Sequence, residues 1–293
     1  MTVTERAERS PTPDPLGMTR AAPAVRHREP RSMQRVLTGV VILYLGVVLI
    51  APIAALLLAA VRLGIPSLLE AVTSDYALSS LNVSLALAAF ALLFNGVFGI
   101  ATALVLVRDR YFLARPIGAL LDISLAVSPV MAGLAMLLLF GRGGWLDGFS
   151  IFGFRVPFAF PALVLATLFV TLPYVAAECG HMLQEVGTEE EAAASTLGAS
   201  AWRTFRSVTL PNVKGGLIVG GILTVTRALG EFGAVLVIGG AIAGKTETAT
   251  TYIYAATEER QHAGAVGMAI LLASVSLVSL AIVALFQRTR GSK

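Results

Sequence analysis

Charged residues are scarce in this chain, because Asp, Glu, Lys and Arg together make up only 14% of its 293 residues. A typical soluble domain carries roughly 25% charged residues. Apolar residues make up 56% of the chain, and the mean hydropathy is +0.79. This composition excludes a soluble globular enzyme, a disordered chain and a nucleic-acid binder, in spite of a net charge of +4.

Cysteine and histidine are almost absent as well. The chain has one cysteine, Cys179, so a disulfide framework and a cysteine-based metal site are excluded. The three histidines, His27, His181 and His262, lie far apart in the sequence, and we expect no histidine metal cluster. We therefore expect neither a metal nor a cofactor on this chain, and the remaining class is a polytopic membrane protein.

Six apolar runs are long enough to cross a bilayer, which takes about 20 residues of helix. The runs are 36–61, 82–107, 116–140, 158–177, 215–243 and 265–286. They predict an all-α membrane protein with six transmembrane helices, in which Pro129 and Pro173 permit bends. Residues 1–35 are polar, are rich in proline and arginine, and lack the apolar core of a signal peptide. We expect them to form a disordered cytoplasmic tail.

Lysine and arginine are unevenly distributed between the segments that connect these runs. The N-terminal tail, 108–115, 178–214 and the C-terminal end together hold 16 of them, whereas the loops of the other side hold five. Such residues accumulate on the cytoplasmic side of a membrane. We therefore expect a multi-pass protein of the cell membrane, embedded in lipid, with both termini in the cytoplasm.

The segment 178–213 is the only sizeable predicted cytoplasmic loop between two runs, and its pattern predicts two short helices. Thr188 and Glu191 have the spacing of a capping box, which marks a helix start. Gly198 suits the left-handed residue that ends a helix. Trp202, Phe205 and Val208 recur every three residues and indicate an apolar face on a second helix, which we expect Pro211 to stop.

This loop resembles the signature of bacterial ABC-transporter permease subunits, called the EAA loop. The shared pattern is two alanines, three residues and a glycine, then nine residues and Val-x-Leu-Pro. The family's helix docks into a cleft of an ATPase, which implies a docking role for Glu191, Ala192, Ala193, Gly198, Val208, Leu210 and Pro211. The family places glutamate six residues before the glycine, where this chain has Ala192. Glu191 lies one residue earlier, and a capping role for it has equal weight.

Other stretches are similar to sulfate and thiosulfate permeases. They lie at 122–130, 138–145, 158–161, 165–174 and 227–234. Two further stretches, at 189–191 and 257–261, favour the CysW type over its CysT-type partner. The resemblance covers residues 78–286 and implies a type-1 (MetI-like) permease domain, with a cytoplasmic coupling helix between helices 4 and 5. It also implies a CysT-type second permease, two copies of an ATPase that binds the ATP, and an extracytoplasmic sulfate-binding protein. Molybdate and tungstate permeases share Gly-Glu-Phe-Gly, so a molybdate permease is the alternative.

Two further features need an interpretation. Residues 239–246 match the Gly-x4-Gly-Lys-Thr phosphate loop, but no soluble stretch is long enough for the α/β sheet that such a loop needs, and we expect an outer turn instead. Arg227 and Glu231 are four residues apart within a run, so they can pair. They are candidates for the translocation path or a gate, and equally for a structural ion pair.

An intramembrane enzyme is the alternative from another class. It would need paired catalytic groups within the spans, such as serine with histidine or two aspartates. No histidine lies in any predicted span, and Asp122 is the only aspartate there. This alternative is therefore disfavoured.

Overall fold

The computed structural model of the protein describes residues 31–108, 112–151 and 153–290. The predicted tail, residues 1–35, therefore lies almost wholly outside the described residues. The chain divides into two units, Met1–Pro52 and Ile53–Lys293. The first contains α1 (Arg31–Leu45) and the π-helical stretch η1 (Gly46–Ile50), and α2 (Ala51–Leu63) follows. Arg35–Leu63 is one helical stretch of 29 residues, and none of the residues in its most apolar 18-residue part is buried.

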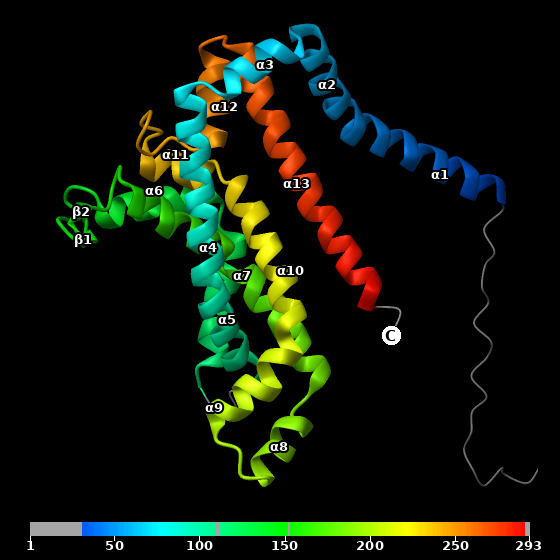
Figure 1. Cartoon of the computed structure of the whole chain (residues 1–293), viewed down its shortest axis with the longest axis vertical. Coiled ribbons are helices and arrows are strands. Elements are labelled where there is room, and N and C mark those ends of the chain that lie inside the picture. Colours follow the sequence, from blue (N-terminus) through cyan, green and yellow to red (C-terminus); the bar gives the residue numbers. More distant parts are fainter. Residues whose placement is uncertain (1–30, 109–111, 152, 291–293) are drawn as a thin grey trace, which may run out of the picture. The chain divides into compact units, whose positions relative to one another are not determined.

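The second unit is almost entirely helical (Figure 1). Its elements are α3 (Ile65–Val72), α4 (Asp75–Arg108), α5 (Ala114–Ala126), α6 (Pro129–Phe140), the hairpin strands β1 (Ser150–Ile151) and β2 (Phe154–Arg155), α7 (Phe160–Val186), α8 (Glu189–Thr196), α9 (Ala201–Thr204), the π-helical η2 (Phe205–Thr209), α10 (Leu210–Leu229), α11 (Gly233–Gly239), α12 (Ala249–Glu258) and α13 (His262–Arg290). With the stretch Arg35–Leu63 included, five described helices are long and apolar enough to span a membrane, and six if the bent pair α5 and α6 is one span.

The core of this unit is the packing of α4, α7 and α10 against one another. Small residues allow the close approach, since a Cβ on Gly216 would lie 2.5 Å from the Glu178 carbonyl oxygen of α7. The buried side chains of Asn95 and Thr171 join α4 to α7 through an Nδ2 to Oγ1 hydrogen bond of 2.7 Å. Close backbone contact and a few interhelical hydrogen bonds are how helices associate in lipid.

The predicted span 116–140 is broken rather than straight. Helices α5 and α6 meet at an angle of 112°. The cause is Pro129, which disfavours the helical region for the residue before it, and Ser128 is extended at φ −59° and ψ 139°. Pro129 therefore begins α6, whereas Pro173 lies inside the uninterrupted helix α7.

Three other sequence predictions were wrong in their boundaries. Helix α7 continues to Val186, so the loop that we placed from residue 178 begins nine residues later. The run 215–243 is not one helix, because α10 ends at Leu229 and α11 begins at Gly233. Pro211 does not stop a helix, since Ala201–Leu229 is helical throughout. The π-helical turn η2 directly before Pro211 is wider than an α-turn, and it accommodates the proline ring.

Candidate functional site

Helix α8 is tied to the rest of the unit by its glutamates. The predicted capping box is wrong, because the Thr188 side chain makes no cap hydrogen bond. The Glu191 carboxylate points elsewhere: its Oε2 lies 3.2 Å from Nε of Arg108, the last residue of α4, and its Oε1 accepts a 2.8 Å hydrogen bond from the Thr209 hydroxyl. Arg108 also donates to the Gly187 carbonyl. Glu191 therefore joins α8 to α4 and to the base of α10.

Most of the remaining surface of α8 is exposed. Ala192 and Ala193 are exposed, and Leu197 is 88% exposed in spite of its apolar side chain. Gly198 has φ +80°, which confirms the predicted left-handed helix end. Leu197 was not among the predicted docking residues, although an apolar residue directly before a helix-ending glycine is a recognisable sequence pattern. The exposed surface of α8 therefore combines the small Ala192 and Ala193 with polar side chains, and Leu197 adds an apolar residue at its end.

The second half of the loop anchors the segment. Phe205 and Leu210 pack against the core cluster that α4, α7 and α10 share, and Val208 is half-buried. The Trp202 and Phe205 rings stack with their centroids 5.6 Å apart. Of the signature residues in this half, only Pro211 is exposed. The structure therefore separates the predicted docking residues into an exposed group on α8 and Gly198, and a group that fixes the position of α8.

Arg227 and Glu231 do pair, as the spacing predicts, with Nη1 and Oε2 2.7 Å apart. Glu231 is not on the helix of Arg227, however, because α10 ends before it. Its side chain is only 1% exposed, and its Oε1 accepts a 2.9 Å hydrogen bond from the Ala234 N–H at the start of α11. The Thr250 hydroxyl donates to the Glu231 carbonyl at 2.5 Å. One carboxylate thus holds the break between α10 and α11 together.

The phosphate-loop pattern at residues 239–246 is a turn, as we expected. The Thr246 hydroxyl donates to the Gly239 carbonyl at 2.7 Å and accepts from the Ile242 N–H at 3.0 Å. This side chain is 1% exposed, so it is occupied within the turn. The next helix, α12, begins only at Ala249 and is capped by Thr248. Among the described residues no group of three or more His, Cys, Asp or Glu side chains could hold a metal ion.

Comparisons with known proteins find relatives among sulfate transport permeases. The chain is 37% identical over 256 residues to the sulfate transport system permease protein CysW of Synechococcus elongatus, which covers 87% of this chain and 90% of the relative. It is 35% identical to CysW of Escherichia coli, over 86% of this chain and 87% of the relative. It is 34% identical to the sulfate transport system permease protein CysT of Escherichia coli, over 83% and 88%.

A solved structure shows the fold independently. A chain of the bacterial alginate ABC transporter, crystallised in complex with an alginate pentasaccharide-bound periplasmic protein, superposes with a TM-score of 0.69. The match has 16% sequence identity and covers 87% of this chain and 92% of that one. It confirms the predicted all-α permease fold. Residues 95–291 match the family described as binding-protein-dependent transport system inner membrane component, and this chain belongs to that family.

Proposed function

We propose that this chain is the CysW-type permease subunit of an ATP-driven importer that moves sulfate or thiosulfate into the cell. The observation that carries the proposal is the 37% identity to a sulfate transport permease over 87% of the chain. In this proposal the chain is not an enzyme and binds no cofactor, because a partner ATPase binds and hydrolyses the ATP. A molybdate permease is the competing assignment.

The proposed assembly has this chain beside a CysT-type permease, with two ATPase copies on one side of the membrane and a sulfate-binding protein on the other. Matches to both CysW and CysT relatives support a pair of related permeases. The excess of lysine and arginine, 16 against five, supports a cytoplasmic position for both termini and for α8. The α6–α7 and α11–α12 connections then face outward.

Uptake of labelled sulfate by a strain that lacks the gene tests the proposal. We expect uptake to be lost on deletion and restored by the wild-type gene. Labelled molybdate uptake is the matched control, and we expect it to stay unchanged. Unchanged sulfate uptake with lost molybdate uptake would contradict the assignment and favour the competing one.

We further propose that the exposed surface around Ala192, Ala193 and Leu197 is the coupling surface that docks into the ATPase. Ala193 is exposed, so Ala193→Leu keeps helix propensity and adds only bulk on this surface. We expect the variant to reach the membrane but to lose both sulfate uptake and co-purification of the ATPase. Ala284→Leu, at another exposed alanine, on α13, is the matched control and should keep both. Normal uptake and co-purification in the Ala193→Leu cells would overturn this role.

The break between α10 and α11 is our candidate for the translocation path or a gate. Arg227 is 30% exposed while its partner Glu231 is almost fully buried, so the guanidinium is the accessible half of the pair. A paired arginine can offer an oxyanion a further contact through its planar fork of donors. Because Glu231 already holds the guanidinium, the contact stays weak enough for release.

A further inference from the structure

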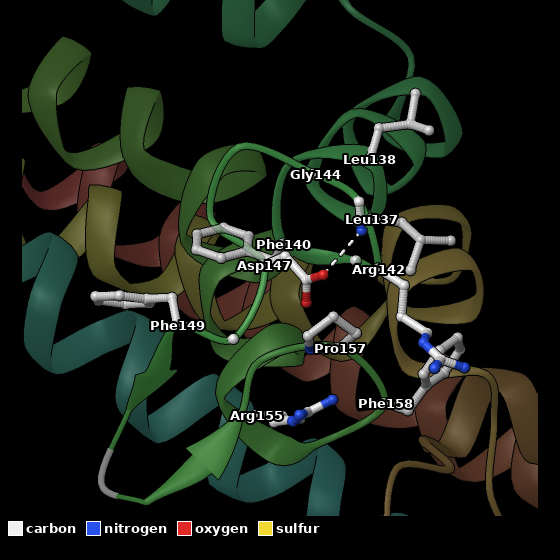
Figure 2. Close-up of a pocket in the computed structure, with 13 residues that line it drawn as sticks. Leu137, Leu138, Phe140, Arg142, Gly144, Asp147, Phe149, Arg155, Pro157 and Phe158 are labelled. Carbon is white, nitrogen blue, oxygen red and sulfur yellow. Dashed lines mark hydrogen bonds between the residues drawn. The ribbon is translucent and has the colours of Figure 1, made fainter.

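A cavity of about 470 Å³ lies in the connection between α6 and α7 (Figure 2). Ligand sites in proteins fall in the range of roughly 300–1,000 Å³. One part of the lining is apolar, with Leu137, Phe140 and Phe158 among its residues. The cavity also receives two arginine side chains, Arg142 from the segment after α6 and Arg155 from β2.

The walls of this cavity are held by specific contacts. Asp147 Oδ2 accepts a 2.9 Å hydrogen bond from the Gly143 N–H, which fixes the turn after α6. Phe158 has φ 58°, an unusual value for a residue with a side chain, and its N–H donates to the Ile238 carbonyl of α11 at 3.0 Å. A Cβ on Gly240 would lie 2.9 Å from the Phe158 ring, so Gly240 packs closely against one edge of this ring. The two arginines therefore extend from a connection whose backbone is fixed by these contacts.

The charge of the cavity is positive. In the described part of the chain the ion pairs are Arg108 with Glu191 and Arg227 with Glu231, so neither cavity arginine has a carboxylate partner. Asp147 is the one acidic residue in the lining, against two guanidinium groups. Two unpaired guanidinium groups beside an apolar wall are suited to a small oxyanion, because each can donate two parallel N–H bonds to a pair of oxygens.

The position of the cavity connects it with the candidate path. Phe158 of the cavity wall bonds to Ile238 near the end of α11, and Glu231 bonds to Ala234 at its start. Helix α11 has seven residues, which corresponds to about 10 Å of rise. A single short helix thus separates the cavity from the Arg227–Glu231 pair.

We propose that Arg142 and Arg155 form an oxyanion-binding site at the outer mouth of the permease, which takes a tetrahedral oxyanion. The site rests on the proposed function, which supplies the outward orientation and sulfate as one source of the ligand. The phosphate of an anionic lipid has the same chemistry. Trp145, which follows the lining residue Gly144 in the chain and is 94% exposed, is a residue type that gathers where lipid headgroups lie.

Binding of labelled sulfate to the complete transporter in lipid nanodiscs, without ATP or binding protein, tests the site. We expect Arg142→Gln and Arg155→Gln each to weaken binding about tenfold, since each removes a charged hydrogen-bonding partner. Lys245→Gln removes an exposed cation outside the cavity and should leave binding unchanged. Asp147→Asn keeps an acceptor oxygen for the Gly143 N–H and removes the opposing charge, so it should tighten binding severalfold.

Two lipid compositions distinguish the two sources. Sulfate bound equally in phosphatidylcholine and phosphatidylglycerol discs, with loss in the arginine variants, assigns the site to the transported anion. Wild-type binding that phosphatidylglycerol suppresses, with the suppression absent in Arg142→Gln, assigns the same site to lipid phosphate. Equal sulfate binding by the wild type and both arginine variants in either lipid, or no binding at all together with no effect of lipid, overturns the site.

Uptake by whole cells separates this site from the proposed function. A deletion strain that still takes up sulfate would refute the proposed function, whatever the nanodiscs show. A deletion strain that loses uptake, combined with arginine variants that bind sulfate as the wild type does, would refute the Arg142–Arg155 site alone.

Discussion

Replacing Gly220 by alanine should push α10 away from α7. A Cβ at this position would lie 2.8 Å from the Val175 Cα and 3.1 Å from the Tyr174 carbonyl oxygen, both of them backbone atoms. Ordinary carbon–carbon contacts are about 3.5–4.0 Å, so the two helices must separate by roughly 1 Å. Because backbone atoms cannot turn aside as a side chain does, the strain falls on the packing of α10 against α7.

The expected magnitude combines two opposing effects. Overpacking of a tight contact costs typically 1–3 kcal/mol. Alanine is a better helix former than glycine by about 1 kcal/mol, which offsets part of that cost. We therefore expect a net destabilisation of about 1 kcal/mol for Gly220→Ala. Gly96 of α4 is the matched control, since a Cβ there meets nothing within 4 Å. Gly96→Ala should gain up to about 1 kcal/mol from the same helix propensity.

The assay is thermal unfolding of the purified full-length chain in detergent. The melting temperature of Gly220→Ala should fall by about 2–4 °C, the shift that 1 kcal/mol produces in a domain of 150–250 residues. The melting temperature of Gly96→Ala should stay level or rise. Equal shifts of the same sign in the two variants would refute the claim that close α7–α10 packing depends on Gly220.

Three charged residues give further predictions. Arg108→Gln removes the cation 3.2 Å from Glu191 and should loosen α8 by roughly 1–2 kcal/mol, seen as faster limited proteolysis at residues 187–200; an unchanged rate would contradict this. Burial raises the pKa of Glu247, so the folded state loses stability as pH rises from the usual glutamate range through the raised value. Glu247→Gln should flatten the dependence of the melting temperature on pH, and an unaltered slope would count against it. Arg227→Gln leaves the buried carboxylate of Glu231 unpaired and should cost about 3 kcal/mol, lowering the yield of inserted protein. Adding Glu231→Gln should restore that yield. Sulfate uptake by the double variant then separates the two roles. Uptake stays low if the pair is part of a gate, and it returns to the wild-type level if the pair is only structural.

The sequence predicts the class of fold well because lipid imposes strong patterns on a chain. Long apolar runs and uneven basic residues suffice for a multi-pass helical protein, and the residues around Gly198 suffice for its family. The left-handed conformation of Gly198 follows from its position after a run of helix formers. The Arg227–Glu231 contact follows from spacing alone. The end of α10 between the two residues could not be predicted, because the apolar run continues past it.

The failures have a common physical origin in tertiary contacts. Glu191 has the spacing of a local cap, but Arg108 lies 83 positions earlier in the chain, and no local pattern reveals that α4 ends beside α8. Pro211 is predicted to stop a helix when only the local sequence is considered, but the π-helical turn before it accommodates the proline ring. The arginine-lined cavity could not be predicted, because Arg142 and Arg155 are brought together only by the turn and hairpin between α6 and α7.

The uninterrupted helix from Ala201 to Leu229 has a mechanical consequence. Its longest α-helical part, α10, has 20 residues, which at 1.5 Å each make a rod about 30 Å long. Thr209, the residue directly before α10, is held by the carboxylate that anchors α8, and the other end of α10 stops beside the Arg227–Glu231 pair. A hydrogen-bonded helix resists compression along its axis far better than a loop does. We therefore expect a displacement of α8 to be passed along α10 to the ion pair, with the π-helical turn η2 as the point where α10 can change its tilt.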